Sequence, residues 1–291
     1  MKKIVVPTDF SECAENALRV AADVARQSKE SAIHLVHVYE RPISGIALEF
    51  YIDNRELNQI REQIHRQMER LVRQDYLDGI EIHKHYIEKK EVWEIPNLKS
   101  FKDAELIVMG THGIKGWQEF FIGSNTQKIV QIAECPVFAI KEHIEKFTIN
   151  SMVFASNFSS EADLVFVKIK KLATMFGATV HLLRVNTDIH FETTHHSRDM
   201  METFAGKFYL TQYTTNIYYD ETVEDGILRF CEKVKPDMIA IETYGRTELV
   251  HLLNPGITEH VEKHVWRPVL SVKIKNTTPI SPVYRKSEPA P

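Results

Sequence analysis

The strongest constraint on the fold is that one order of elements occurs twice along the chain. Residues 105–141 and 237–273 align without a gap over 37 residues, and seven of those positions are identical. Upstream, KIVVPTDFS at 3–11 has its counterpart in SMVFASNFS at 151–159, and HLVHV is followed 147 residues later by HLLRV. Because this order is kept throughout, we predict a duplication in which each half folds as a domain.

Each half alternates short β-rich runs with helical patterns. In the first half, helices are expected at 12–29, at about 53–74, at 92–104 and at 124–135, and the β-rich runs between them end in PVFAIK. Strands that alternate with helices are typical of a parallel sheet covered on both faces. We place the domain boundary between the halves, with domains at 1–144 and 148–275. The proline-rich end, 276–291, is expected to be a disordered tail.

Composition excludes several classes of protein. The net charge is −4 and the isoelectric point is near 6.4, so a nucleic-acid binder with a basic surface is not expected. No apolar run approaches the roughly 18 residues that a membrane span needs, and the N-terminus lacks the apolar core of a signal peptide. The three cysteines form no CxxC pair. These features predict a cytoplasmic protein.

Glycine is concentrated in one short stretch, MGTHGIKGWQEFFIGSNTQK, which spans residues 109–128. It holds four of the 11 glycines in the chain. Three of them, Gly110, Gly113 and Gly123, form a spaced pattern that ends with Ser124 at the start of a predicted helix. Glycine permits positive φ and lets backbone N–H groups face an anion, and a helix N-terminus favours phosphate.

With IVVPTDFSECAENAL, HLVHV, ELIVMGTHG, the glycine pattern and CPVFAIK all in place, the chain resembles the universal stress protein family, as a tandem member. In that family the glycine pattern is the ATP-binding signature. The resemblance implies an α/β fold of two tandem Rossmann-like domains, of the adenine nucleotide alpha hydrolase-like kind. Each domain would be a five-stranded parallel sheet of order 3-2-1-4-5 flanked by helices. It also implies that the two domains pair through their last strands, and it leaves room for a homodimer.

Strand order 3-2-1-4-5 places a ligand crevice between the first and fourth strands, where the order reverses. Asp9 is expected at adenine or ribose, Val38 on the adenine side, and the hydroxyls of Ser124 and Thr126 at the phosphates. His112 is about equally well explained as a phosphate contact and as a solvated loop residue. The full predicted nucleotide site is Pro7, Thr8, Asp9, Val38, Met109, Gly110, His112, Gly113, Gly123, Ser124, Asn125 and Thr126.

The second half has lost this pattern. Asn157 stands in place of Asp9, Glu242 in place of Gly110 and Pro255 in place of Gly123. A carboxylate at Glu242 would repel phosphate, and proline has no N–H to donate. We therefore expect one nucleotide site in the chain, in the first domain. Glycine at these positions is taken to be required by the ligand and not by folding alone.

Histidine-rich segments offer a weaker signal. DIHFETTHHSRDM at 188–200 has imidazoles and carboxylates that suit zinc, but its spacing fits no standard motif, so a solvated loop is favoured. His83 and His85 share one face of a predicted strand and are expected at the surface. No metal site and no catalytic residue are predicted.

The resulting hypothesis is a stress-response protein that binds ATP, or AMP or ADP in its place, and acts as a regulatory or protective module. Mg²⁺ would accompany a triphosphate, although no acid is clearly placed to hold it. Two alternatives remain open: an interaction scaffold that works without nucleotide, and a slow ATPase. The adenine nucleotide is the expected partner, and neither nucleic acid nor a membrane is.

Overall fold

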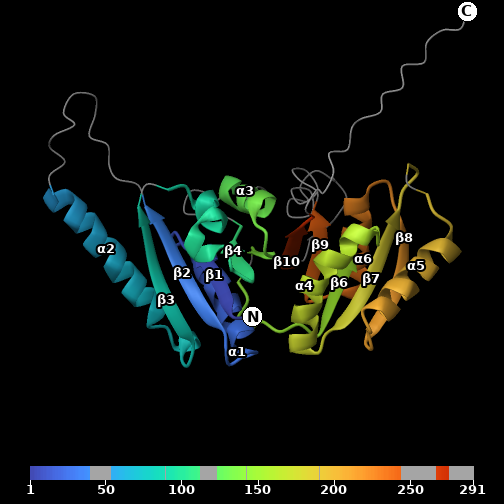
Figure 1. The fold of residues 1–291 in the computed structure, drawn as a ribbon, viewed down its shortest axis with the longest axis horizontal. Coiled ribbons are helices and arrows are strands. Elements are labelled where there is room, and N and C mark those ends of the chain that lie inside the picture. Colours follow the sequence, from blue (N-terminus) through green and yellow to red (C-terminus); the bar gives the residue numbers. More distant parts are fainter. Residues whose placement is uncertain are drawn as a thin grey trace, which may run out of the picture.

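The computed structural model describes residues 1–39, 54–88, 90–111, 123–141, 143–189, 191–243 and 267–274. A ten-stranded sheet runs through this part of the chain, with helices on both of its faces (Figure 1). The predicted tail, 276–291, lies outside the described residues. Among the described helices, none is both long enough and apolar enough to cross a membrane.

In the described part of the first half there are five strands, three α-helices and short 3₁₀ turns. The turns at Val92–Asn97 and Lys99–Phe101 replace the single helix expected at 92–104, because Pro96 lies inside the first turn and cannot donate a backbone hydrogen bond. The other elements are β1 (Lys3–Pro7), α1 (Glu12–Arg26), β2 (Ala32–Tyr39), α2 (Asn54–Val72), β3 (Glu81–Glu88), β4 (Leu106–Gly110), α3 (Ser124–Ile132) and β5 (Val137–Ile140).

The second half repeats the order strand, helix, strand, helix, strand, helix, strand, and then a last strand. The loop predicted at 188–200 is wrong in part, because α5 begins at Thr194. Thr193 caps this helix by accepting the N–H of His196, and Met201 and Phe204 anchor its buried face. The elements are β6 (Ser151–Ala155), α4 (Ser160–Phe176), β7 (Thr179–Asn186), α5 (Thr194–Lys207), β8 (Tyr213–Tyr219), α6 (Val223–Val234), β9 (Met238–Thr243) and β10 (Val269–Lys273).

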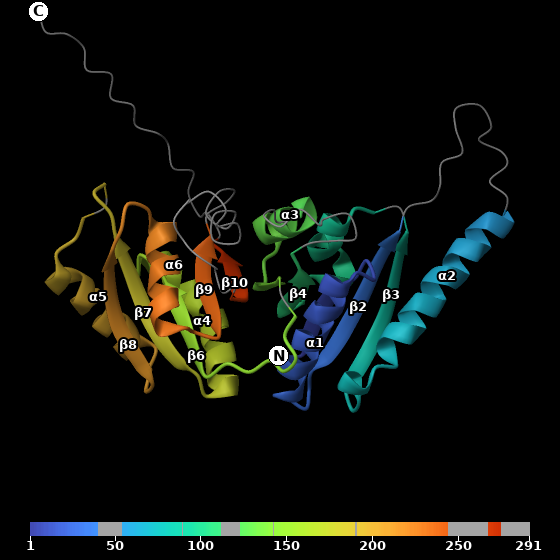
Figure 2. The ribbon, with the colours of Figure 1, turned by 180° about the vertical axis from the view of Figure 1, so that it is seen from behind.

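The strand order is β3-β2-β1-β4-β5-β10-β9-β6-β7-β8. Each half is therefore a parallel sheet of order 3-2-1-4-5, which confirms the predicted fold. The halves join where β5 and β10 pair antiparallel, with Leu270 opposite Phe138. The strand β10 lies in the middle of the molecule, on the side of the second half that faces the first (Figure 2). The hydroxyl of Ser271 also donates to the carbonyl of Val137 at 3.3 Å.

The apolar core continues across this junction. On one face of the sheet, a cluster of buried residues includes Phe138 and Ile140 of the first half together with Phe154 and Phe166 of the second. The Phe138 and Phe147 rings pack edge to face, with centroids 5.3 Å apart. Lys171 of α4 also forms an ion pair with Glu105, directly before β4. The two halves are thus packed against each other as well as joined by the sheet.

Candidate functional site

The loop after β1 is fixed by its own side chains. The Thr8 hydroxyl accepts the N–H of Phe10 at 3.0 Å, and the Asp9 carboxylate accepts the N–H of Ser11 at 3.0 Å. Phe10 takes a φ of 64°, an uncommon conformation for a non-glycine residue that these two bonds help to hold. Ser11 then caps α1 by accepting the N–H of Ala14. Asp9 is therefore held in a set orientation beside the end of β1.

A histidine that the sequence reasoning missed supports the same loop from β2. His37 Nδ1 lies 2.7 Å from the carbonyl oxygen of Thr8, and the His37 ring packs on Phe10 with centroids 4.4 Å apart. Burial holds the pKa of His37 below its usual value, although the Thr8 carbonyl and the charge of Asp9 act in the opposite direction. The neutral ring donates to Thr8. The only sequence signal was its place in HLVHV, where the second half has Arg184.

The glycine at the end of β4 has a structural reason. A Cβ on Gly110 would lie 2.7 Å from Cys13 Sγ and 2.8 Å from both the carbonyl carbon and oxygen of Cys13. The first turn of α1 therefore fills the space that a side chain would need. Packing alone therefore gives Gly110 a reason to be glycine, since the approach of α1 to β4 leaves no room for a Cβ, and its expected role at the ligand stays a prediction.

Gly123 immediately precedes α3 and closes the segment that begins at Thr111. Its N–H donates to the carbonyl of Thr111 at 2.7 Å, and a Cβ there would lie 3.1 Å from that same oxygen. Its φ is −58°, and the positive-φ glycines of the described chain are Gly79 and Gly177. Neither Gly110 nor Gly123 uses the positive φ that glycine permits, whereas both lie close to neighbouring backbone.

The N-terminus of α3 differs from that of α1. No side chain among the described residues caps α3, and its first turn carries no acidic residue. By contrast, α1 is capped by Ser11 and has Glu12 and Glu15 in its first turn. Ser124 and Asn125 are exposed, and the first turn of a helix carries N–H groups without intrahelical partners together with the positive end of the helix dipole. This end of α3 is suited to an anion.

One predicted phosphate donor is committed elsewhere. Thr126 is buried, and its hydroxyl donates to the carbonyl of Gly110 at 3.1 Å. The bond ties α3 to the end of β4, so in this structure the hydroxyl does not point a free donor toward a phosphate, and its predicted role there stays a prediction. Ser124 remains as the exposed hydroxyl of the first turn.

The remaining predicted residues lie at the same edge of the sheet. Pro7 ends β1 and pairs with β2, whose penultimate residue is Val38. Met109 of β4 and Val38 pack with one apolar cluster, on the face of the sheet opposite the core that includes Phe138. Because β1 and β4 are adjacent parallel strands, their carboxyl ends and following loops meet. His112 and Gly113 lie outside the described residues.

The second half keeps the loop but fills the crevice differently. The Ser156 hydroxyl accepts the N–H of Phe158 at 2.8 Å, Asn157 Oδ1 accepts the N–H of Ser159 at 2.9 Å, and Phe158 has a φ of 57°. Glu242 then turns toward this loop, where one carboxylate oxygen accepts the Ser156 hydroxyl at 2.9 Å and the Asn157 N–H at 3.2 Å. The carboxylate therefore stands between the two strand ends. Pro255, the counterpart of Gly123, lies outside the described residues.

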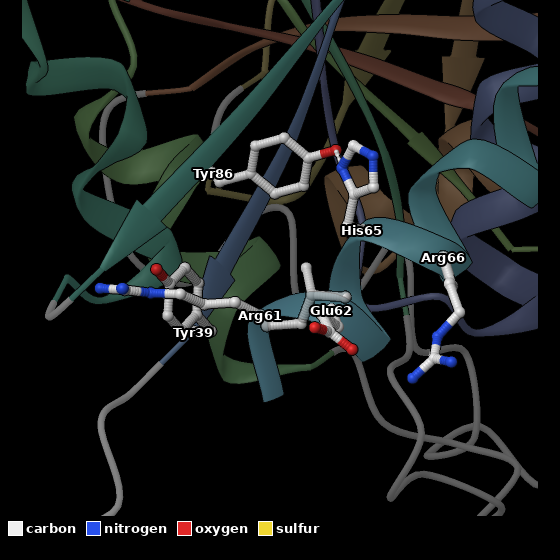
Figure 3. A pocket seen from close by; sticks show the side chains of 7 residues that line it. Tyr39, Arg61, Glu62, His65, Arg66 and Tyr86 are labelled. Atoms are coloured by element: carbon white, nitrogen blue, oxygen red, sulfur yellow. Dashed lines mark hydrogen bonds between the residues drawn. The ribbon is translucent and has the colours of Figure 1, made fainter. Parts of the chain in front are cut away.

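A separate cavity of about 520 Å³ lies between α2 and the strands β2 and β3 at the edge of the sheet (Figure 3). The hydroxyl of Tyr86 points to His65, whose Nδ1 lies 3.2 Å away. Arg61 is paired with Glu88 at 3.0 Å. None of the predicted site residues lines this cavity, so it is distinct from the crevice between β1 and β4. The lining residues are Tyr39, Arg61, Glu62, Ile64, His65, Arg66 and Tyr86.

Comparison with known proteins points to one family. A profile of the universal stress protein family matches residues 1–141 and, a second time, residues 148–273. Universal stress protein MJ0531 of Methanocaldococcus jannaschii is 30% identical over 145 residues, which cover 48% of this chain and 82% of the relative. Universal stress protein YxiE of Bacillus subtilis is 25% identical over 146 residues, which cover 48% of this chain and 98% of the relative.

A solved structure extends the similarity to both halves. The crystal structure of a universal stress protein from Archaeoglobus fulgidus matches with a TM-score of 0.66 at 18% identity, covering 94% of this chain and 99% of that chain. A second structure, of a protein described as functionally unknown from Pseudomonas aeruginosa, matches with a TM-score of 0.58 at 17% identity, covering 94% and 93%. At these identities the likeness concerns the fold.

Proposed function

The chain belongs to the universal stress protein family, and we propose on that premise that its first domain binds ATP or a related adenine nucleotide. The binding site is the crevice beyond β1 and β4. The family resemblance supplies the nucleotide, and the local chemistry of the crevice supports its placement.

The observation that carries the proposal is the N-terminus of α3. It has no side-chain cap among the described residues and no acid in its first turn, and it begins beside the end of β4. Ser124 and Asn125 are exposed, and the N–H groups of this first turn, together with the helix dipole, favour a phosphate. The missing Cβ of Gly123 lets that phosphate come close to the backbone.

The base and sugar belong at the other wall of the crevice. The loop at Thr8 and Asp9 is held by four hydrogen bonds, from Phe10, Ser11, His37 and its own strand pairing, so it is preorganised for a ligand. Asp9 is the acceptor for ribose hydroxyls or for an adenine N–H group. Val38 and Met109 offer apolar surface on the same side.

The second domain is proposed to have a structural role. Glu242 places a carboxylate between the strand ends, where it would repel a phosphate, and it is engaged by the loop at Ser156 and Asn157. Through β10, this domain covers the edge of β5 that would otherwise be exposed. It thereby takes the place of a second subunit, and one nucleotide binds per chain.

The proposed activity is regulatory or protective binding in the cytoplasm. Cys13, Cys135 and Cys231 are free thiols, which agrees with a reducing compartment. Turnover of ATP is at most slow on this proposal, since the residues named here bind and orient the nucleotide and none is assigned to attack the γ-phosphate. A scaffold that works without nucleotide is the competing function, and the experiment below separates the two.

Gly123→Asp is the decisive variant. Aspartate is a favoured N-cap residue, so its carboxylate would occupy the N–H groups that the phosphate needs while the helix keeps its stability. We expect calorimetry to show ATP binding by the natural chain and a loss of more than about tenfold in the variant, from charge repulsion and competition. Gly206→Asp is the control, because Gly206 is exposed in the other half and a Cβ there meets nothing within 4 Å.

Two further outcomes separate the functions. Adenine nucleotide that co-purifies with the protein, detected by mass spectrometry, supports the nucleotide site. No binding by the natural chain at millimolar ATP supports the scaffold. Equal ATP affinity in the natural chain and in Gly123→Asp contradicts the placement of the phosphates at α3.

A further inference from the structure

Three histidines gather on one face of β2 and β3, away from the crevice. His34 of β2 pairs in register with His83 of β3, and His85 follows two residues later. Side chains two apart in a strand point to the same face, and cross-strand partners share a face as well. The sequence placed His83 and His85 at the surface but gave no sign that His34 would join them.

Two of the three rings already aim nitrogen atoms at each other. His34 Nδ1 lies 2.9 Å from His85 Nε2, and the two rings lie nearly parallel, at 18°, with centroids 5.1 Å apart. The third ring, His83, lies 4.8 Å from that of His34, and its Nε2 is 3.0 Å from a carboxylate oxygen of Glu81.

The surroundings hold the pair in place and leave it open to solvent. The buried ring of Phe101 meets His34 and His85 edge-on, with centroids 6.3 and 5.1 Å away, and so forms an apolar support beneath them. His34 and His85 are partly exposed. Lys3, a cation whose charge acts on both histidines, is paired with Asp103 at 2.6 Å. A dissolved ion can therefore reach the two nitrogens.

We propose that His34 Nδ1 and His85 Nε2 form a two-histidine chelate for a late first-row divalent cation such as Zn²⁺. Zinc binds imidazole nitrogen at about 2.0–2.1 Å, so two tetrahedral ligands are about 3.3 Å apart. The two nitrogens, now 2.9 Å apart, lie nearly on the line between the ring centroids. To admit the ion they must separate by a few tenths of an ångström, and the two rings must also turn so that their lone pairs converge on the ion instead of pointing at each other. Water fills the remaining coordination positions.

The bonding balances without a change in total charge on the rings. In the present hydrogen bond one nitrogen carries a hydrogen and the other accepts it. On binding, that hydrogen moves through water to the other nitrogen of its own ring, and both facing nitrogens offer lone pairs to the ion. Within the described residues no group of three or more ligands stands ready to hold a metal, so this is an open site unlike a closed structural zinc centre.

The second domain supplies a natural control. His181 occupies the position of His34, and its Nδ1 lies 2.8 Å from the hydroxyl of Thr214. The residues that correspond to His83 and His85 are Thr214 and Asn216. At these three described positions the second half therefore has a single imidazole and cannot form the same chelate.

The test is a calorimetric titration of Zn²⁺ alone into the full chain at pH 7, after removal of any affinity tag and treatment with a chelator. We expect one Zn²⁺ site, and His34→Ala and His85→Ala should each lower its Zn²⁺ affinity by at least about tenfold. Removing even a residue that only hydrogen-bonds a metal ligand commonly lowers metal affinity by about tenfold, so removing a ligand itself should cost no less. His181→Ala should bind as the natural chain does. Cu²⁺ should bind more tightly than Zn²⁺.

A second measurement guards against a folding defect. His34→Gln and His85→Gln keep a polar side chain without imidazole and should unfold at the same urea concentration as the natural chain while losing the site. Zn²⁺ should also shift the imidazole NMR signals of His34 and His85 and leave that of His181 unchanged. The proposal is overturned if the natural chain and both alanine variants bind Zn²⁺ with equal affinity. It is also overturned if the natural chain binds Zn²⁺ no more tightly than a single imidazole such as that of His181 would.

Discussion

Gly110→Ala separates the structural role of the glycine motif from its proposed role at the ligand. The added methyl carbon would lie 2.7 Å from Cys13 Sγ and 2.8 Å from the carbonyl carbon and oxygen of Cys13. Real Cβ atoms do not tolerate contacts this short, and two of the three atoms belong to the backbone. Since that backbone is the first turn of α1, β4 and α1 must move apart.

The expected cost follows from the type of contact. Inserting a methylene-sized group into a packed interior costs about 1–3 kcal/mol, and the backbone contacts place this variant at the upper end. For a chain of this size, each kcal/mol lowers the melting temperature by about 2–4 °C. Because α1 begins directly after the loop that holds Thr8 and Asp9, nucleotide affinity should fall together with stability.

The assay is urea unfolding of the natural chain, Gly110→Ala, Cys13→Ala and the double variant. Removing Sγ relieves one of the three short contacts, so Cys13→Ala should recover part of the loss in the double variant. Gly110→Ala with unchanged stability would refute the packing argument. If that variant also failed to bind ATP, the glycine would serve the ligand directly after all.

Three further predictions concern His37, Glu242 and Phe138. Burial lowers the pKa of His37, so the folded state favours the neutral ring, and its contribution to stability is present above pH 6.5 and is lost as pH falls below that value. Between pH 8 and 5, the free energy of unfolding measured with urea should fall less steeply with decreasing pH in His37→Gln than in the natural chain. The difference between the two slopes is at most about 1.4 kcal/mol per pH unit, and equal slopes would contradict this. Glu242→Ala removes two hydrogen bonds to a carboxylate and should lower the free energy of unfolding by about 1–2 kcal/mol. ATP should not add a second binding site to this variant. Unchanged stability would show that Glu242 does not hold the loop in place. Phe138→Ala empties a fully buried site at the junction of the halves and should cost about 3–5 kcal/mol, against almost nothing for the exposed Tyr209→Ala, and calorimetric scanning measures both.

The repeat and the alternation of elements were sufficient to predict a parallel sheet in each half, and the family resemblance supplied its strand order. Strand order, the two domains and the meeting of β1 with β4 all follow from local pattern together with the family resemblance. The start of α5 was missed because Thr193 is a weak cap signal in a polar segment, and its helix is stabilised by tertiary packing of Met201 and Phe204.

The reasons behind individual site residues depended on contacts between distant residues. Gly110 lies against Cys13 and Thr126 donates to Gly110, and neither contact leaves a periodic trace in the sequence. The pairing of His34 with His85 likewise depends on strand register, which hydrophobic pattern alone does not fix for three polar positions.

The most direct test of the central claim is the stoichiometry of ATP binding to the full chain by calorimetry. An uncapped α3 in the first domain and Glu242 in the second predict one ATP per chain, and Gly123→Asp should abolish that binding while Gly206→Asp leaves it intact. Two equivalent sites per chain, or one site that Gly123→Asp does not affect, would contradict the account.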